Sequence, residues 1–311
     1  MDLTRILGVD IGGTKTHLAV GLGGRVERER IVETPLWRTH SHPDNALALH
    51  ALVRDWLGPE ALGRPLAVGA HGCDSTELCD LFAAELRRYF LGTVRVVNDA
   101  ELLGPAMGLD RGIGVIAGTG SIAVARHAGR LVTAGGWGWV LGDEGSAAGL
   151  VREATRAVLG ALDRGERPDP LARRLLHSID VRGGPELALA VTTAGSTAWL
   201  GRHAEEIFRA VDEGSVLAGD VVRRAGEDLA TLVDRLTARG VDGTEIIAGG
   251  AVILAQPLLR NVFVDAIRVR HAGSTVHFLD RPPVLGALAL AGASVQAASV
   301  QAAPAPVREA R

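Results

Sequence analysis

The sequence predicts an α/β fold of two similar halves, each starting with three antiparallel strands. Three observations lead to this prediction. Residues 5–107 read as three strands followed by alternating helices and strands, and residues 112–134 read as the same three-strand start again. In both copies a glycine turn follows the first strand. Each half would then build a mixed sheet, and the two halves would enclose a cleft into which both glycine turns point.

The length of 311 residues is enough for two domains with a substantial core. We expect an N-terminal domain at residues 1–110 and a C-terminal domain at residues 111–293, which carries a helical insertion. We expect the last helix of the second domain to pack against the first domain. Residues 294–311 show little patterning, which predicts a disordered tail.

Composition and charge exclude several classes of protein. A formal net charge of −3 argues against a general nucleic-acid binder, which would show a basic excess. No apolar run reaches the roughly 18 residues that span a membrane, and the N-terminus lacks the basic-then-apolar order of a signal peptide. Cys73 and Cys79 can build neither a disulfide framework nor a four-thiolate zinc site, so we expect two buried or idle thiols. A cytoplasmic enzyme that binds neither nucleic acid nor membrane fits best.

In the first half, strands are predicted where apolar and β-branched residues run up to a turn. Gly23-Gly24 is a two-residue hairpin signal, and Pro35 ends the third strand. The predicted strands are residues 5–10, 16–22, 25–33, 65–70 and 94–97. Helices are predicted from apolar residues at helical spacing behind a start signal, at residues 43–57 and 75–90 and in a short segment ending at Met107.

The second half repeats the strand pattern and then inserts helices. Tight turns are expected at Gly118-Thr119-Gly120 and Ala128-Gly129. The predicted strands are residues 112–117, 121–126, 130–134, 245–248 and 276–279. The predicted helices are residues 146–162, 169–178, 185–193, 198–213, 216–239, 257–270 and 282–293. The glycine-rich segment 135–146 fits no regular element, which indicates a loop shaped to approach a ligand.

The first glycine turn is the segment GVDIGGTKT at residues 8–16. It has one residue too many for a Walker A loop, and a strand rather than a helix follows, so that motif is rejected. A hairpin turn can still bind phosphate, since Gly12 and Gly13 allow close approach of backbone N–H groups. Lys15, the only lysine among 33 basic residues, favours phosphate chemistry. Asp10 would hold a divalent metal, directly or through water, although a glycine hairpin with an incidental aspartate stays open as the alternative.

The second glycine turn imitates a dinucleotide-binding fingerprint. Gly118 and Gly120 follow a strand, and Asp143 lies 20 residues beyond Ala123. A dinucleotide fold needs a helix directly after the glycines, whereas the residues that follow are typical of a strand. The sequence therefore predicts a second phosphate-facing hairpin that mirrors the first.

Asp99 follows a buried strand and precedes a helix. Its position is typical of a helix N-cap, which is the commoner role of an aspartate there, and it also suits a carboxylate at the end of a sheet. A second pair of carboxylates, Asp143 and Glu144, lies between glycines in segment 135–146.

These segments together resemble the N-acetylglucosamine kinase branch of the BadF/BadG/BcrA/BcrD ATPase family. The resemblance spans residues 5–292, and the GGWG…GDEGS segment within residues 135–146 is its most specific part. It is carried by Val9–Thr16, Asn98–Ala100, Gly118–Ser121, Gly135–Ser146, Gly249–Ala251 and Pro283–Ala291. The resemblance implies an actin-like ATPase fold, in which two ribonuclease-H-like domains surround an ATP cleft.

The resemblance also implies cofactors and roles. ATP and Mg²⁺ would be the cofactors, Asp10 would serve Mg²⁺, and Asp99 would be the catalytic base on a sugar hydroxyl. ATP contacts are implied for Gly12, Gly13, Thr14, Lys15, Thr16, Gly118, Thr119, Gly120, Gly249 and Gly250. Sugar contacts are implied for Asp99, Ser121, Gly136, Trp137, Gly138 and Asp143.

Two loops depart from the family pattern. Residues 34–42 lack the expected asparagine, and residues 71–76 replace a small-residue stretch with His-Gly-Cys-Asp. Trp37, Arg38, His71 and Asp74 are therefore further candidates for sugar contact. Arg38 could pair with an acidic or larger glycoside, and a loop that simply faces solvent stays open as the alternative.

The leading hypothesis is an ATP-dependent kinase for O6 of an amino sugar such as N-acetylglucosamine, assembled as a homodimer like many of its relatives. One alternative is an ATPase that activates a reductase through an iron–sulfur cluster. Its cysteines would be well separated and in the second domain, unlike Cys73 and Cys79. A non-catalytic sugar sensor is the other alternative.

Overall fold

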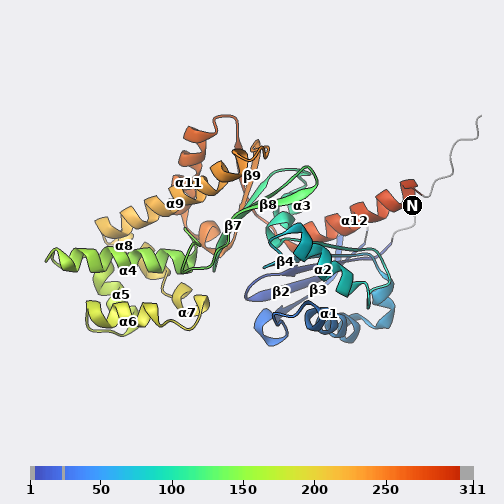
Figure 1. Cartoon of the computed structure of the whole chain (residues 1–311), viewed down its shortest axis with the longest axis horizontal. Coiled ribbons are helices and arrows are strands. Elements are labelled where there is room, and N and C mark those ends of the chain that lie inside the picture. The colour runs from blue at the N-terminus through green and yellow to red at the C-terminus, as the bar shows by residue number, and fades with distance from the viewer. Residues whose placement is uncertain (1–3, 23–24, 302–311) are drawn as a thin grey trace, which may run out of the picture. The chain divides into compact units, whose positions relative to one another are not determined.

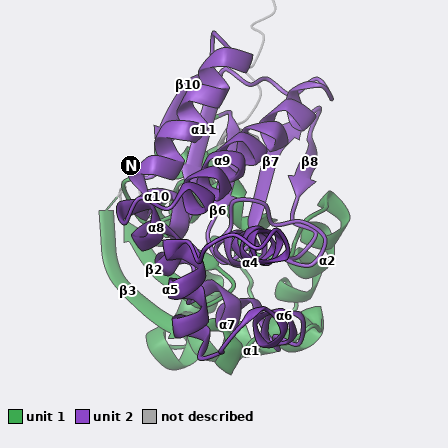
Figure 2. Ribbon diagram, turned by 90° about the vertical axis from the view of Figure 1, so that its left-hand side faces the viewer, with its two compact units in different colours: residues 1–110, 280–311 green, residues 111–279 purple. Residues whose placement is uncertain are grey.

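The computed structural model describes residues 4–22 and 25–301 (Figure 1). The chain forms two compact units, residues 1–110 with 280–311 and residues 111–279 (Figure 2). The expected hairpin turn at Gly23-Gly24 and the last part of the expected tail, residues 302–311, lie outside the described residues. A five-stranded mixed sheet forms the centre of each unit.

The sheet of unit 1 has the strand order β3-β2-β1-β4-β5. The first three strands pair antiparallel, and β4 and β5 join parallel to β1. Their bounds are β1 Ile6–Ile11, β2 Lys15–Leu22, β3 Arg25–Glu33, β4 Leu66–Ala70 and β5 Val94–Val97. Because β1, β4 and β5 run parallel, their carboxyl ends meet at one edge of the sheet, where Asp10 and the loops after β4 and β5 lie.

Helices on both faces complete unit 1. They are α1 His42–Leu57, α2 Thr76–Leu86, α3 Leu103–Ala106 and α12 Val284–Gln301, with the 3₁₀ helices η1 Thr34–Leu36, η2 Pro59–Gly63 and η3 Asp99–Leu102. Helix α12 crosses β1 at Gly8, where an added Cβ would lie 2.9 Å from the backbone nitrogen of Leu288. Glycine is thus needed for this close approach, and Asp10, two residues along β1, points to the same face of the sheet.

The sheet of unit 2 has the same topology. Its order is β10-β9-β6-β7-β8, with β6, β7 and β8 antiparallel and β9 and β10 parallel to β6. The bounds are β6 Ile113–Ala117, β7 Ser121–His127, β8 Arg130–Gly135, β9 Glu245–Gly249 and β10 Thr275–Phe278. Each strand takes the place of its counterpart five numbers earlier, which confirms the predicted duplication and the α/β fold with three-strand antiparallel starts.

Unit 2 also contains the predicted helical insertion between β8 and β9. Its long helices α4 and α9 pack together (Figure 1), and α9 also packs on β6, β7 and β8. The helices are α4 Ala147–Asp163, α5 Pro170–Ile179, α6 Gly184–Thr192, α7 Thr197–Gly201, α8 Glu205–Asp212, α9 Val216–Thr237, α10 Ala251–Ala255 and α11 Pro257–Arg270.

Three predicted helices differ from the structure. The final helix does not end at Ala293 but continues to Gln301, so residues 294–301 are not a disordered tail. Alanine and glutamine favour helix, and neither Gly nor Pro interrupts this stretch. The predicted helix 198–213 is two helices, α7 and α8, and α7 ends at Gly201. Helix α2 ends at Leu86 instead of residue 90.

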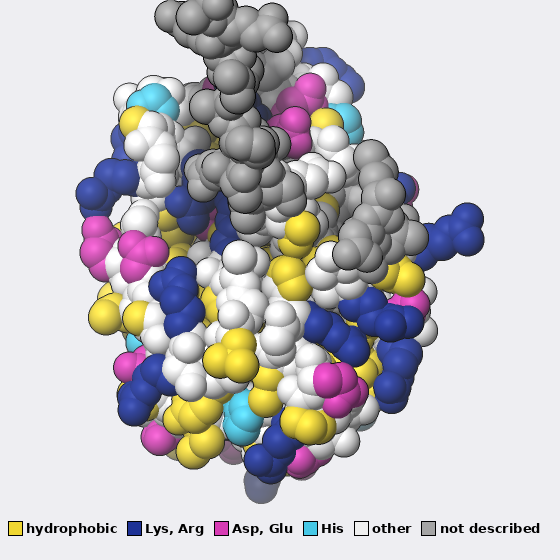
Figure 3. All heavy atoms as spheres, turned by 90° about the vertical axis from the view of Figure 1, so that its right-hand side faces the viewer, with side chains coloured by type: hydrophobic (Ala, Val, Ile, Leu, Met, Phe, Trp, Pro, Cys, Tyr) yellow, Lys and Arg dark blue, Asp and Glu magenta, His cyan; other side chains and the backbone are white. Residues whose placement is uncertain are grey.

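The surface carries both signs of charge. On the face seen in Figure 3, Lys and Arg side chains lie singly or in small groups among hydrophobic and acidic ones. No helix in the described residues is both long and apolar enough to cross a bilayer.

Candidate active site

The first glycine turn connects β1 to β2 in unit 1. The backbone N–H of Gly12 donates to the Lys15 carbonyl at 3.0 Å and closes the turn, and the Thr34 N–H donates to the Thr14 carbonyl at 2.9 Å. A Cβ on Gly12 would lie 3.1 Å from the Lys15 carbonyl oxygen, so the turn leaves little room for a side chain there. Gly13, Thr14 and Lys15 are exposed. The turn can therefore present these three residues to a phosphate.

Thr16 lies inside the unit, contrary to its expected place at a phosphate. Its side chain is fully buried; the hydroxyl pairs with the Thr34 hydroxyl at 2.9 Å and accepts the indole N–H of Trp37 at 3.1 Å. Strand alternation accounts for this, since Lys15 points outward and the next side chain must point inward. Thr16 and Trp37 thus hold η1 against β2, and the indole N–H of Trp37 is engaged within the protein.

Asp10 and Asp99 lie at the same edge of the unit 1 sheet. Asp10 is near the end of β1, and Asp99 begins η3, with only Asn98 between it and the end of β5. Burial, together with the smaller effect of the charge of Asp99, raises the pKa of Asp10 to about 8. Burial also raises the pKa of Asp99. Two buried carboxylates that repel each other are typical of sites that bind a cation or transfer a proton.

Asn98, and not Asp99, caps the helix η3. Its side-chain oxygen accepts the Ala100 N–H at 2.9 Å, while the Glu101 carboxylate accepts the Asn98 N–H at 3.0 Å, which forms a capping box. The Asp99 carboxylate accepts the Ala100 N–H through Oδ1 at 3.1 Å. Its Oδ2 faces the loop after β4. The N-cap role considered for Asp99 is therefore filled by its neighbour.

The two loops that depart from the family pattern meet at Asp99. Nδ1 of His71 lies 3.8 Å from Oδ2 of Asp99, and the guanidinium of Arg38 donates to the His71 carbonyl. Asn98 donates from Nδ2 to Oδ1 of Asp74 at 2.8 Å. The positive charges of His71 and Arg38 lower the pKa of Asp99 and so oppose the effect of burial, whereas Asp74 adds to it. The structure thus brings together four of the sequence-predicted residues in one polar cluster.

The two cysteines lie beside this cluster. Cys73 and Cys79 are buried and unbridged, as predicted, and the Cys79 thiol donates to the Cys73 carbonyl at 3.4 Å. The same carbonyl accepts from Asn98 at 3.3 Å. The orienting role of Asn98 is the part of the site that sequence reasoning missed, although Asn98 followed by Glu101 three residues later is a readable capping signal.

The second glycine turn, in unit 2, carries a carboxylate. The Gly118 N–H donates to the Gly120 carbonyl at 2.9 Å. Buried Asp143 accepts the Ser121 N–H at 3.3 Å, and a Cβ on Gly120 would lie 3.0 Å from its Oδ2. Asp143 has a left-handed φ of 57°. The loop after β8 therefore places Asp143 directly against this turn.

Gly249 and Gly250 lie where β9 meets α10, next to the same turn. Gly250 has φ 101°, and a Cβ there would lie 2.5 Å from the Ala117 carbonyl oxygen. A Cβ on Gly118 would in turn lie 3.6 Å from the Ala251 nitrogen. Within unit 2, the turn that holds Gly118 and Gly120 and the segment at Gly250 thus lie side by side, so close that Gly250 has no room for a side chain.

The remaining predicted sugar contacts of unit 2 are divided between interior and surface. Ser121 is buried, and its hydroxyl donates to the Glu144 carbonyl at 2.7 Å. Trp137 is 70% exposed, between Gly136 and Gly138 with left-handed φ values of 75° and 78°. Ser121 thus fixes the loop, whereas the Trp137 ring is exposed at its surface.

The chemistry of Asp10 fits Mg²⁺. This ion prefers oxygen ligands and keeps several waters, so one carboxylate with phosphate oxygens is a usual protein site. The raised pKa of Asp10 marks a carboxylate whose ionised form lacks sufficient neutralising charge. In the described residues no group of three or more His, Cys, Asp or Glu could hold a metal alone. Asp10 would accordingly share the ion with a bound phosphate.

Comparison with protein families gives a match over two thirds of the chain. Residues 82–295 match the model of the BadF/BadG/BcrA/BcrD ATPase family. An N-acetylmuramic acid/N-acetylglucosamine kinase of Clostridium acetobutylicum is 29% identical over 230 residues, which cover 70% of this chain and 73% of that protein.

Solved structures with the same fold cover nearly the whole chain. A candidate N-acetylglucosamine kinase from Chromobacterium violaceum has a TM-score of 0.66 at 24% identity, over 93% of this chain and 99% of that one. A ROK family glucokinase from Streptomyces griseus, in complex with glucose and AMPPNP, has a TM-score of 0.56 at 20% identity, over 94% and 99%. At these identities the likeness shows the fold.

Proposed function

The chain belongs to the BadF/BadG/BcrA/BcrD ATPase family, and from this premise we propose that it transfers the γ-phosphate of ATP to O6 of an amino sugar. N-acetylglucosamine is the first candidate acceptor, because the related Clostridium acetobutylicum protein is named as a kinase of this sugar and of N-acetylmuramic acid. We place the enzyme in the cytoplasm and expect a homodimer.

The observation that carries the proposal is the environment of Asp99. A general base works best when its pKa lies near the operating pH, and burial raises the pKa of this carboxylate toward that range. Oδ1 is held by the Ala100 N–H, which leaves Oδ2 facing His71 as the proton-accepting atom. Asp99 would accept the proton of the sugar hydroxyl as that oxygen attacks the γ-phosphorus.

Phosphoryl transfer needs donors for the phosphate oxygens and little covalent chemistry from the protein. We assign Gly12, Gly13, Thr14 and Lys15 of unit 1 to ATP phosphates, and Gly118, Thr119 and Gly120 of unit 2 to the same kind of contact. Gly249 and Gly250 would leave room for the adenosine. When bound, Mg²⁺ would neutralise charge on the phosphates, and Asp10 would hold it.

The acceptor hydroxyl would be positioned by the polar cluster around Asp99. Arg38, His71 and Asp74 come from two different loops, and the loops are fixed by Asn98 and by the bond from Arg38 to the His71 carbonyl. We assign Asp143, Gly136, Trp137 and Gly138 to the sugar as a further group. Ser121 would act through the loop it fixes.

The alternative of an iron–sulfur activator ATPase gains no support from the cysteines. Cys73 and Cys79 are only 1% and 2% exposed, whereas a cluster shared with a second copy needs thiolates at the surface. A non-catalytic sugar sensor would lack turnover and is separated by the experiment below.

A coupled assay of ADP release tests the proposal with N-acetylglucosamine, N-acetylmuramic acid, glucosamine and glucose as acceptors. We expect turnover with N-acetylglucosamine, and NMR of the product should show phosphate on O6. Asp99→Asn should lower kcat by about 100-fold or more with ATP binding retained. Asp80→Asn, an exposed aspartate on α2, is the matched control. Undiminished turnover in Asp99→Asn would rule out Asp99 as the catalytic base. If none of the sugars causes ADP release, the result favours the sugar sensor or the activator ATPase.

A further inference from the structure

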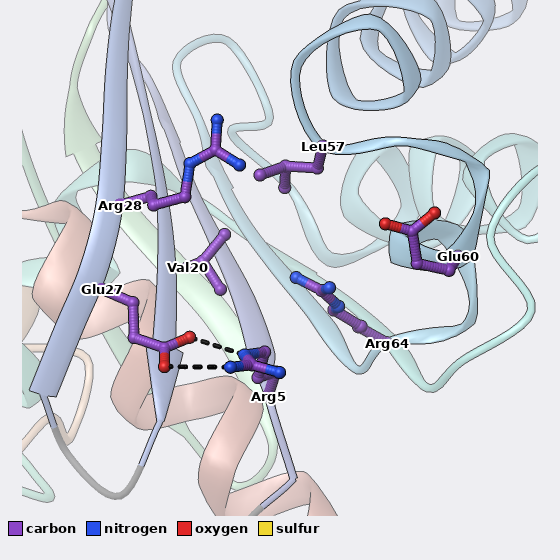
Figure 4. Close-up of a pocket in the computed structure, with 7 residues that line it drawn as sticks. All are labelled: Arg5, Val20, Glu27, Arg28, Leu57, Glu60 and Arg64. Carbon is purple, nitrogen blue, oxygen red and sulfur yellow. Dashed lines mark hydrogen bonds and ion pairs between the residues drawn. The ribbon is translucent and has the colours of Figure 1, made fainter.

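A cavity of about 340 Å³ lies in unit 1, away from the carboxylate cluster. Arg5, Val20, Glu27, Arg28, Leu57, Glu60 and Arg64 line it (Figure 4). Arg5 precedes β1 and Asp10 lies near its other end, so five residues of extended strand separate them by roughly 17 Å. The cavity is thus distinct from the candidate active site, and its volume is at the small end of ligand pockets, about 300–1,000 Å³.

A β-bulge places two consecutive charged side chains in this cavity. Val20 of β2 pairs with Arg28 and Gly21 pairs with Val26, which leaves Glu27 without a strand partner. In a regular strand, neighbouring side chains point to opposite faces, and a bulge changes that direction. Glu27 and Arg28 therefore both line the cavity, as Figure 4 shows.

Glu27 already neutralises one of the three guanidinium groups. Its carboxylate accepts from Arg5 at 2.7 Å and 3.3 Å. In the described part of the chain, neither Arg28 nor Arg64 forms an ion pair, and the two side chains extend into the cavity from opposite sides in Figure 4. Arg28 is held in place by the Trp56 carbonyl at 3.3 Å and by the Trp56 ring, 5.4 Å from its guanidinium carbon.

We propose that this cavity is a binding site for a compact monophosphate, either inorganic phosphate or a monosaccharide phosphate. Three guanidinium groups face two carboxylates, so the lining keeps a net positive charge. A phosphate monoester carries close to two negative charges and at least three acceptor oxygens, which can bridge Arg28 and Arg64, whereas a carboxylate carries one negative charge on two oxygens. Val20 and Leu57 provide an apolar wall for an attached sugar ring.

Glu60 is the group that opposes an anion in this cavity. Its carboxylate folds back over the Gly58 turn, where a Cβ on Gly58 would lie 2.6 Å from Oε2. Removing the charge of Glu60 should therefore strengthen anion binding, and removing that of Arg64 should weaken it. These opposite expectations keep the proposal testable even if one variant fails to fold.

Calorimetric titration without ATP, Mg²⁺ or acceptor sugar tests the site and does not depend on the kinase activity. The probes are inorganic phosphate, glucose 6-phosphate and acetate. We expect both phosphates to bind, acetate to bind about tenfold more weakly, and Arg64→Gln to weaken phosphate binding about tenfold or more. Glu60→Gln should bind about two- to fivefold more tightly. Tighter binding of glucose 6-phosphate than of phosphate identifies a sugar phosphate, and equal binding identifies inorganic phosphate.

Two further variants locate the anion. Arg54→Gln removes an exposed guanidinium of α1 outside the cavity lining and should bind phosphate like the wild type. Lys15→Ala should also keep this binding, because Lys15 belongs to the first glycine turn. Loss of binding in Lys15→Ala with full binding in Arg64→Gln would place the phosphate in that turn and overturn the proposal, as would the absence of binding by the wild type.

Discussion

Nδ1 of His71 lies 3.8 Å from Oδ2 of Asp99. The imidazole is 58% exposed, whereas the Asp99 side chain beneath it is 12% exposed. Burial raises the pKa of Asp99, the charge of His71 lowers it, and the charge of Asp74 raises it. The loop after β4 therefore places a positively charged group, His71, and a negatively charged group, Asp74, near Asp99. The protonation of Asp99 depends on both.

His71→Gln should move the acidic limb of the kcat/KM profile to higher pH. The substitution removes a positive charge that favours ionised Asp99, so the pKa of the base rises and a higher pH is needed to deprotonate it. The measurement is kcat/KM for the acceptor sugar between pH 5 and 9.

Asp74→Asn should move the same limb to lower pH. It removes a negative charge that raises the pKa of Asp99, and an amide oxygen can still accept from Asn98. Asp80→Asn on α2 should leave the profile unchanged. Shifts in the same direction for His71→Gln and Asp74→Asn would contradict this electrostatic account.

Asp10→Asn should stabilise the metal-free protein at pH 8. Burial and Asp99 raise the pKa of Asp10 from 3.8 to about 8, so the folded state holds a proton that the unfolded chain loses. The stabilisation of the folded state by this proton is complete below about pH 4 and is lost as the pH rises toward 8. Asparagine has no proton to lose, and the melting temperature of the variant in EDTA should exceed that of the wild type at pH 8, with a smaller difference at pH 5.

Magnesium should reverse this order. With ATP present at pH 8, the phosphates and the Asp10 carboxylate would hold Mg²⁺ together, so adding Mg²⁺ should raise the melting temperature of the wild type, whereas that of Asp10→Asn should rise less. Turnover of the variant should fall sharply. If Asp10→Asn melts below the wild type in EDTA at pH 8, then the ionised carboxylate of Asp10 does not destabilise the folded protein.

Local signals account for what the sequence predicted well. The first strand of each unit is an apolar, β-branched run that stops at or next to a glycine turn, so β1, β6 and the turns that follow them can be predicted without tertiary information. The burial of Thr16 was also readable, because Lys15 at the exposed turn fixes the alternation of β2. The Ala-rich stretch after Ala293 has no apolar face at helical spacing, so only its helix propensity indicates the continuation of α12 to Gln301.

Tertiary contacts account for what was missed. The proximity of His71 to Asp99 depends on the order of β4 and β5 in the sheet, which no residue pattern specifies. Whether Asn98 or Asp99 caps the helix depends on the residue at which η3 begins, and the two possible starts differ by one position. The bulge that leaves Glu27 without a strand partner depends on the pairing of β2 with β3, which the sequence of β3 alone does not specify.

Gly250→Ala should destabilise unit 2 and weaken ATP binding. A Cβ there would lie 2.5 Å from the Ala117 carbonyl at a φ of 101°, so strain and overlap together should cost about 2–4 kcal/mol. Gly214→Ala is the matched control, because Gly214 has a φ of 81° and open space around it, and it should cost only about 1 kcal/mol. Urea unfolding measures both, and equal losses would show that the contact with Ala117 is unimportant.

Thr16→Val and Thr14→Val should have opposite effects. Thr16 is fully buried, and its loss leaves the Thr34 hydroxyl and the Trp37 indole without a partner, at a cost of about 1–3 kcal/mol in unfolding free energy. The KM for ATP should hardly change. Thr14 is exposed on the turn, so its replacement should alter stability by no more than about 0.5 kcal/mol and raise the KM for ATP. A raised KM in Thr16→Val at wild-type stability would instead return Thr16 to the phosphate.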